Sequence, residues 1–169
     1  MQSIKEKMQP MFMAANDMTS GYFPNWMNKY EIGPLPVGEA KPELHELAEG
    51  ITTVETESEE EEEDYAYYSH RGSTEKEITS VNSSFAFEGH RKYKDNPAQQ
   101  LVRDALDKTG DGRKVYFRHT EPDGRIREGK ATLSGIVHTG GDANVRGTLE
   151  FTVTFDGTPK DTKGTVPEG

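Results

Sequence analysis

The segment 144–157, NVRGTLEFTVTFDG, constrains the fold most, because its side chains alternate between apolar and polar. A period of two is the pattern of a strand with one face buried and the other in water. The segment therefore predicts a half-buried strand of an antiparallel sheet, whose apolar face needs a second layer to cover it. The apolar set is Val145, Leu149, Phe151, Val153 and Phe155, and the polar set is Arg146, Thr148, Glu150, Thr152 and Thr154.

Several other segments have strand character. Ile51–Val54 is β-branched throughout, Val81–His90 alternates, and the turn EPDG follows RKVYFRH, so that Tyr116–Val137 reads as a hairpin. These segments predict a mainly β fold, an antiparallel β-sandwich. In the second of them the expected apolar face is Val81, Phe85, Phe87 and Gly89.

One helix is expected between the strands. Asn96 is a good N-cap, Pro97 suits the first helical position, and Gln99 completes a start of the capping-box type. An apolar stripe follows, and Gly110 is a natural C-cap. The pattern predicts a helix over residues 97–108 that covers one sheet face, which makes the fold an α+β variant of an all-β architecture.

Eight of the ten residues from Glu55 to Asp64 are acidic. Like charges at this density repel one another and cannot pack in a core. A tyrosine-rich stretch and a Gly-Ser turn come next. The sequence therefore predicts an acidic loop or long hairpin at residues 55–78 that projects from the sheet.

The chain has 169 residues, which favours one domain with arms: an N-terminal arm at 1–45, the domain at 46–159 and a flexible tail at 160–169. Leu, Ile, Val and Phe total 29, about 17%, so the core is small and partners must complete the burial. Residues 1–45 fit a loosely ordered arm. Alternatively, the arm lodges three aromatic anchors on a neighbouring subunit, Phe23, Trp26 and Tyr30.

Charge and motifs exclude several functions. A net charge of −10 disfavours a conventional nucleic-acid binder and docking on an anionic membrane. No cysteine is present, and the five histidines lack metal-site spacing. A calcium-like loop starts at Asp107, but Arg118 stands where the bidentate Glu is required. We expect no enzyme activity, no metal and no cofactor.

Three stretches resemble the major tail proteins of long-tailed phages of Gram-positive hosts, the TP901-1-like tail tube family. They are GITTVETESEEEEEDYAYYS, FEGHRKYKDNPAQQLV and GIVHTGGDANVRGTLEFTVTFDGTP, and the resemblance spans about residues 46–159. It implies a β-sandwich subunit with a flanking helix. It also implies that six subunits form a ring, that rings stack into a tube, and that strands of all six line a conduit for genomic DNA.

The resemblance implies partners and a place as well. The partners are other copies of the chain, the tail terminator, distal tail and tape measure proteins, and DNA in transit without sequence-specific binding. The place is the virion tail, with the host cytoplasm during assembly. Two alternatives remain: another ring component, such as a tail terminator or accessory protein, and an acidic DNA-mimic inhibitor. Crowding of the acids into one run argues against the mimic.

Two sets of residues are candidate functional sites. A low-friction lumen wall suits hydroxyls and one carboxylate, which favours Thr148, Glu150, Thr152 and Thr154, although this face can instead pack against protein. The acidic run has three interpretations: an inter-ring contact, which is favoured, a solvated loop tip, or lumen charge. That run comprises Glu59, Glu60, Glu61, Glu62, Glu63 and Asp64.

Overall fold

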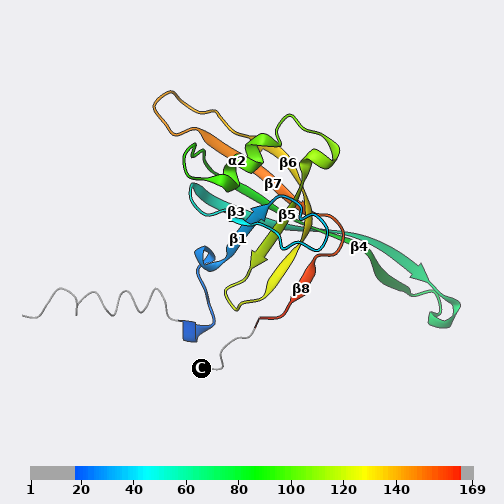
Figure 1. Cartoon of the computed structure of the whole chain (residues 1–169). Helices are drawn as coiled ribbons and strands as arrows, with labels where there is room; N and C mark the ends of the chain where they lie inside the picture. Colours follow the sequence, from blue (N-terminus) through cyan, green and yellow to red (C-terminus); the bar gives the residue numbers. More distant parts are fainter. Residues whose placement is uncertain (1–17, 165–169) are drawn as a thin grey trace, which may run out of the picture.

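The computed structural model describes residues 18–164, and strands dominate it (Figure 1). One α-helix and four single-turn 3-10 helices accompany eight strands in this range. The strands are β1 (Lys29–Gly33), β2 (His45–Glu46), β3 (Ile51–Ala66), β4 (Thr74–His90), β5 (Lys114–Thr120), β6 (Ile126–Val137), β7 (Thr148–Phe155) and β8 (Lys160–Thr162). The 3-10 helices are η1 (Met18–Ser20), η2 (Asn25–Met27), η3 (Tyr68–His70) and η4 (Gly110–Arg113), and the α-helix is α2 (Pro97–Asp104).

All strands belong to one antiparallel sheet in the order β2-β1-β5-β6-β7-β4-β3, and β8 pairs with β6 beside this path. The sheet curls over itself, because β1 packs against β4 although three strands separate them. The ring of Tyr30 on β1 lies 5.2 Å from that of Phe87 on β4. The mainly β fold with one helix is confirmed, and its two layers are halves of one curled sheet.

The core fills the inside of the curled sheet. The alternation in β7 is confirmed there, because Leu149, Phe151, Val153 and Phe155 are all buried. The rings of Phe87 and Phe151 stack at 4.8 Å. Val145 was expected on the same face but is exposed, because residues 142–145 form a turn and β7 begins only at Thr148.

Helix α2 begins as predicted and ends early. The Asn96 side chain accepts a hydrogen bond from Gln99 N at 3.1 Å, and Pro97 takes the first helical position. The helix stops at Asp104 instead of residue 108, and Arg113 donates to the carbonyls of Leu106 and Lys108 at 2.8 Å each. Its buried residues, Ala98 and Val102 among them, join the core, so α2 closes the inside of the curled sheet and leaves the opposite face open.

The predicted hairpin is formed by β3 and β4, which run far beyond the rest of the sheet (Figure 1). The acidic segment is therefore paired strand for most of its length instead of an irregular loop. Val81 was expected on the buried face with Phe85 and Phe87. It is 51% exposed, because this part of β4 has left the core and pairs with Glu60 in the projecting hairpin.

Both ends of the described chain join the sheet, which corrects the predicted arm and tail. Lys29–Gly33 pairs with β5 as β1, and Ile32 is buried in the core. Lys160–Thr162 pairs with β6, where Arg125 holds Asp161 through two 2.8 Å contacts. This ion pair lowers the pKa of Asp161. Residues 1–17 of the predicted arm and 165–169 of the predicted tail lie outside the described range.

Candidate functional site: polar face, hairpin and groove

The four residues predicted to line a lumen lie together on the face of β7 that points away from the core. Glu150 is exposed, and Thr148, Thr152 and Thr154 are half-buried between the neighbouring strands. Pairing with β4 and β6 extends this face sideways into three rows. These rows, which we name the polar face, are Glu57-Ser84-Thr154-Thr132-Lys114, Glu55-Ala86-Thr152-Ser134 and Thr53-Glu88-Glu150-Val137.

Hydroxyl and carboxylate groups dominate the polar face. Glu88 and Glu150 lie directly opposite each other on β4 and β7. Two like charges in such a pair repel each other and destabilise the sheet unless water screens them. No described residue forms an ion pair with either of them. The alternation within β7 is enough to predict that Glu150 lies on this face. Strand pairing is needed to show that Ser84 and Glu88 of β4 lie on it too.

One lysine belongs to these rows, and a carboxylate neutralises it. Lys114 Nζ lies 2.7 Å from Asp156 Oδ2 and 2.6 Å from Thr132 Oγ1, and the Thr132 hydroxyl donates to Asp156 Oδ1 at 2.6 Å. Burial alone would raise the pKa of Asp156, but hydrogen bonds from Lys114 and Thr132 and the nearby lysine charges hold it lowered. The carboxylate is therefore ionised at neutral pH, and the polar face has no uncompensated lysine or arginine among its described rows.

The hairpin concentrates the charge of the whole chain. Residues 55–78 contain ten acidic residues against Arg71 and Lys76, so they carry −8 of the net charge of −10. Glu59–Asp64 lies along the paired shaft, whose side chains face solvent on both sides. Lys76 pairs with Glu62, and the Tyr65 hydroxyl donates to Glu63. One interpretation of the sequence placed the acidic run at a loop tip. In the structure the run instead forms the shaft of the hairpin.

The tip comprises residues 67–74 and has a different chemistry. Arg71 is its one residue with a full charge at neutral pH. Tyr67 is 50% exposed, and Tyr68 is fully exposed. Backbone hydrogen bonds to the carbonyls of Tyr67 and Tyr68 fix the turn, in which Arg71 takes the left-handed conformation at φ 52°. The tip therefore presents tyrosine rings on an ordered turn.

The root of the hairpin is clamped to α2 by a buried glutamine. Gln99 is fully buried, and its amide donates to the carbonyls of Glu49 and His90 at 3.2 and 3.1 Å. Its oxygen accepts from the backbone of Lys92 at 2.8 Å and from Arg91 at 3.2 Å. These contacts account for the GHRKYKDNPAQ motif as a structural joint between the ends of β3 and β4.

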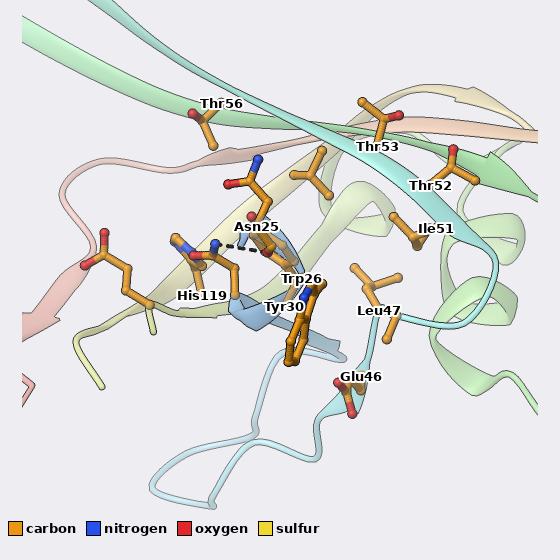
Figure 2. Close-up of a pocket in the computed structure, with 14 residues that line it drawn as sticks. Asn25, Trp26, Tyr30, Glu46, Leu47, Ile51, Thr52, Thr53, Thr56 and His119 are labelled. Atoms are coloured by element: carbon orange, nitrogen blue, oxygen red, sulfur yellow. Dashed lines mark hydrogen bonds between the residues drawn. The ribbon is translucent and has the colours of Figure 1, made fainter. Parts of the chain in front are cut away.

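A groove of about 630 Å³ opens between the start of β3 and the segment that leads into β1 (Figure 2). Leu47, Ile51 and Val54 supply apolar walls, and the Trp26 ring stands at the mouth with 73% of its surface exposed. The acidic residues Glu46 and Glu121 also line the groove, and its lining contains no lysine or arginine. Sequence reasoning did not find this groove, because its walls come from segments far apart in the chain.

His119 lies at the inner side of the groove and is 7% exposed. Its Nε2 lies 2.9 Å from Asn28 Oδ1, and its ring stacks on Tyr30 at 4.8 Å. Nδ1 is buried and has no hydrogen-bond partner in the described part of the chain. Burial, helped by the charge of Arg127, lowers the pKa of His119 to about 4, so the ring is neutral at pH 7.

The three predicted arm anchors separate in the structure. Tyr30 is half-buried: its ring packs against Phe85 and Phe87 of its own core, and the residue forms part of the groove lining. Phe23 is half-buried, and Trp26 is mostly exposed. Of the three, Trp26 has the exposure that an anchor on another molecule needs.

Among the described residues, no group of three or more His, Asp or Glu side chains is placed to hold a metal ion. Within residues 18–164, none of the helices has the length and apolar character needed to span a membrane.

The fold is that of virion tail proteins. The tail of an empty gene transfer agent (GTA) particle, refined as a helix with C6 symmetry, matches with a TM-score of 0.64 and 18% identity over 84% of this chain and 100% of that chain. A chain in the virion of the native GTA particle matches with a TM-score of 0.61 and 17% identity over the same shares. No protein-family model and no curated protein matches the sequence. At these identities the likeness establishes the fold, and a phage-like tail fold is what the sequence resemblance implied.

Proposed function

We propose that this chain is a structural tail tube protein without enzyme activity. Six copies form a ring, rings stack into a tube, and DNA passes through it without sequence-specific binding. Other copies of the chain are the main partner, and the tail terminator, distal tail and tape measure proteins meet the ends and the bore. The narrower resemblance, to the TP901-1-like proteins of phages of Gram-positive hosts, is part of this proposal, as is a place in the virion after assembly in the host cytoplasm.

The observation that carries the proposal is the open edge of β3 in a fold shared with virion tails. This strand has 16 residues and ends the sheet, so one lateral row of its backbone groups has no strand partner among the described residues. Long unprotected edges template association with other chains, and proteins normally shorten or cover them. A neighbouring copy in a ring would cover this edge, and closure of the ring would remove it altogether.

The polar face supports a role as the wall of the bore. Each lysine or arginine that touches phosphate releases a counterion and adds affinity for DNA. Thr148, Glu150, Thr152 and Thr154 offer hydroxyls and a carboxylate, and the lysine beside them is already paired with Asp156. A duplex would slide along such a surface without being held. The hairpin that carries Glu59–Asp64 is then the contact between rings.

Electron microscopy of the purified full-length protein tests the proposal. Stacked tubes with sixfold end views are the expected result. Single rings that never stack would favour a terminator or accessory ring component. Monomers that bind a nuclease or repressor, and form neither rings nor tubes at any concentration, would favour the DNA mimic and contradict the tube.

A further inference from the structure

Two of the exposed aromatic side chains, Trp26 and Tyr68, lie near opposite ends of β3. Trp26 stands in the groove beside the start of β3, and Tyr68 lies at the far end of the hairpin that β3 forms with β4. Both rings are open to solvent, at 73% and 104% of the reference exposure. Aromatic side chains of this kind are the usual anchors of protein interfaces.

The charges of the tip and the groove are complementary. The tip, residues 67–74, has a net charge of +1 from Arg71, whereas the shaft, residues 55–66 and 75–78, has −9 from ten acids and Lys76. The groove is lined by Glu46 and Glu121 and by no cation. An acidic groove attracts the tip and repels the shaft, and such a repulsive element selects one part of the hairpin over the other.

The tip is also ordered before it meets a partner. Three backbone hydrogen bonds of 3.1 to 3.3 Å close the turn on the carbonyls of Tyr67 and Tyr68, and Ser73 Oγ donates to the carbonyl of His70 at 2.8 Å. The Tyr67 ring stacks on that of Tyr65 at 6.2 Å and meets the His70 ring edge-on at 6.1 Å. A turn that is already fixed loses little conformational entropy on binding.

We propose that the hairpin tip of one copy docks in the Trp26 groove of another copy, with Tyr68 against the Trp26 ring and Arg71 attracted by the negative charges of Glu46 and Glu121. This inference rests on the proposed self-assembly and names the two surfaces that join one ring to the next. The acidic shaft spans the gap between them and is not itself the adhesive surface.

The length of the hairpin keeps a copy from docking its tip in its own groove. The groove of one copy is separated from its own tip by Val54–Ala66, about 40 Å of extended strand at about 3.3 Å per residue. The tip of each copy therefore reaches the groove of a copy displaced along the hairpin. In the proposed tube, where successive rings are displaced along the axis, such a contact between two different surfaces repeats from ring to ring as an open-ended stack.

Trp26 is the single tryptophan of the chain, so its fluorescence reports on the groove alone. The full-length parent, brought from dilute solution to assembly, should show emission moving to shorter wavelength and protection from acrylamide quenching. Tyr68→Ala should lose both changes and raise the concentration needed for stacking by about tenfold or more, as loss of an interface anchor does. Val37→Ala removes an exposed apolar side chain elsewhere and should behave as the parent.

A charge exchange tests the pairing of the two surfaces. Arg71→Asp tolerates the left-handed backbone and reverses the charge of the tip. It should weaken stacking, as should the pair Glu46→Lys and Glu121→Lys, and the three changes together should restore it. Circular dichroism on each variant separates a lost contact from lost folding. Restored stacking in the triple variant would also show that none of the three changes prevents folding.

The outcomes distinguish this inference from the proposed function. Tubes in which Trp26 remains as exposed as in the free chain, or Tyr68→Ala tubes that form as readily as parental ones, overturn the docking and leave the tube in place. A parent that forms no rings or tubes overturns the proposed function. In that case, protection of Trp26 that rises with concentration and is lost in Tyr68→Ala still supports the docking, and its absence overturns both.

Discussion

Lys114 Nζ and Asp156 Oδ2 lie 2.7 Å apart at the Thr154 end of the polar face, and Thr132 bridges the pair. The side chains of Lys114 and Asp156 are 25% and 28% exposed, so water can reach them, and in the proposed tube a duplex could as well. A lysine held in this way is neutralised by its partner and has part of its hydrogen-bonding capacity occupied. Asp156 thereby prevents the one lysine of these rows from binding phosphate.

Removal of that carboxylate should turn the polar face into a DNA-binding surface. Asp156→Asn keeps the shape and an acceptor for Thr132 but frees Lys114. We expect retention of duplex DNA by assembled protein, with a plot of log affinity against log salt that steepens by about 0.9 per phosphate contact. The combination with Lys114→Gln should abolish the gain, and Glu39→Gln, the same charge change at an exposed site, should not produce it. An equal gain in Glu39→Gln would place the effect in net charge and not in Lys114.

Phe151 tests the assignment of the faces of β7. It is 2% exposed and stacks on Phe87, so Phe151→Ala should lower the free energy of unfolding by about 3–5 kcal/mol through lost burial and the cavity left behind. Thr152→Ala, one position along on the polar face, should lower it by only about 1 kcal/mol or less, the span of strand propensities. Denaturant unfolding of the two variants gives the comparison. Similar losses in both would show that the two faces are not as distinct as the structure has them.

These residues also show what the sequence could and could not predict. The faces of β7, the N-cap at Asn96 and the hairpin were predictable, because each depends on neighbours within a few residues. The place of β1 in the sheet was not, since Tyr30 and Ile32 find their partners on strands more than 50 residues later. The groove and the Lys114–Asp156 pair were missed for the same reason, because strand order brings their parts together and no local pattern encodes it.

Charge removal from the shaft tests whether the acidic run is adhesive. In the variant with Glu59, Glu60, Glu61, Glu62 and Glu63 all changed to Gln, the size of each side chain is kept and most of the shaft charge is lost. If the tip makes the contact, tubes should still form, and they should form at lower salt, because repulsion between shafts no longer needs screening. Turbidity and electron microscopy across a salt series give the result. Shortened tubes, matched by the parent at high salt, would assign the contact to the shaft instead.

His119 should make the stability of the fold depend on pH. Burial holds its folded-state pKa at about 4, against an ordinary value of 6.5, so the unfolded chain binds a proton at a higher pH than the folded one. The contribution of the neutral ring is complete above about pH 6.5 and declines as the pH falls toward 4, because protonation of the unfolded chain then favours unfolding. Nε2 faces an amide oxygen that can only accept, so Nδ1, which is buried without a partner in the described chain, is the atom that must take the proton.

Melting temperatures measured from pH 7.5 to 4 on the parent and on His119→Gln should diverge below about pH 6.5, with the parent losing stability faster. Carboxylates titrate in the same range, but they are shared by both proteins and cancel in the difference. His90→Gln, at an exposed histidine, should follow the parent throughout. Titration of the His119 ring by NMR gives the folded-state value directly. A ring that titrates near 6.5 in the folded protein, together with parallel melting curves for the parent and His119→Gln, would mean that water or a proton acceptor reaches Nδ1 and that the ring is not sealed into the core beside Tyr30.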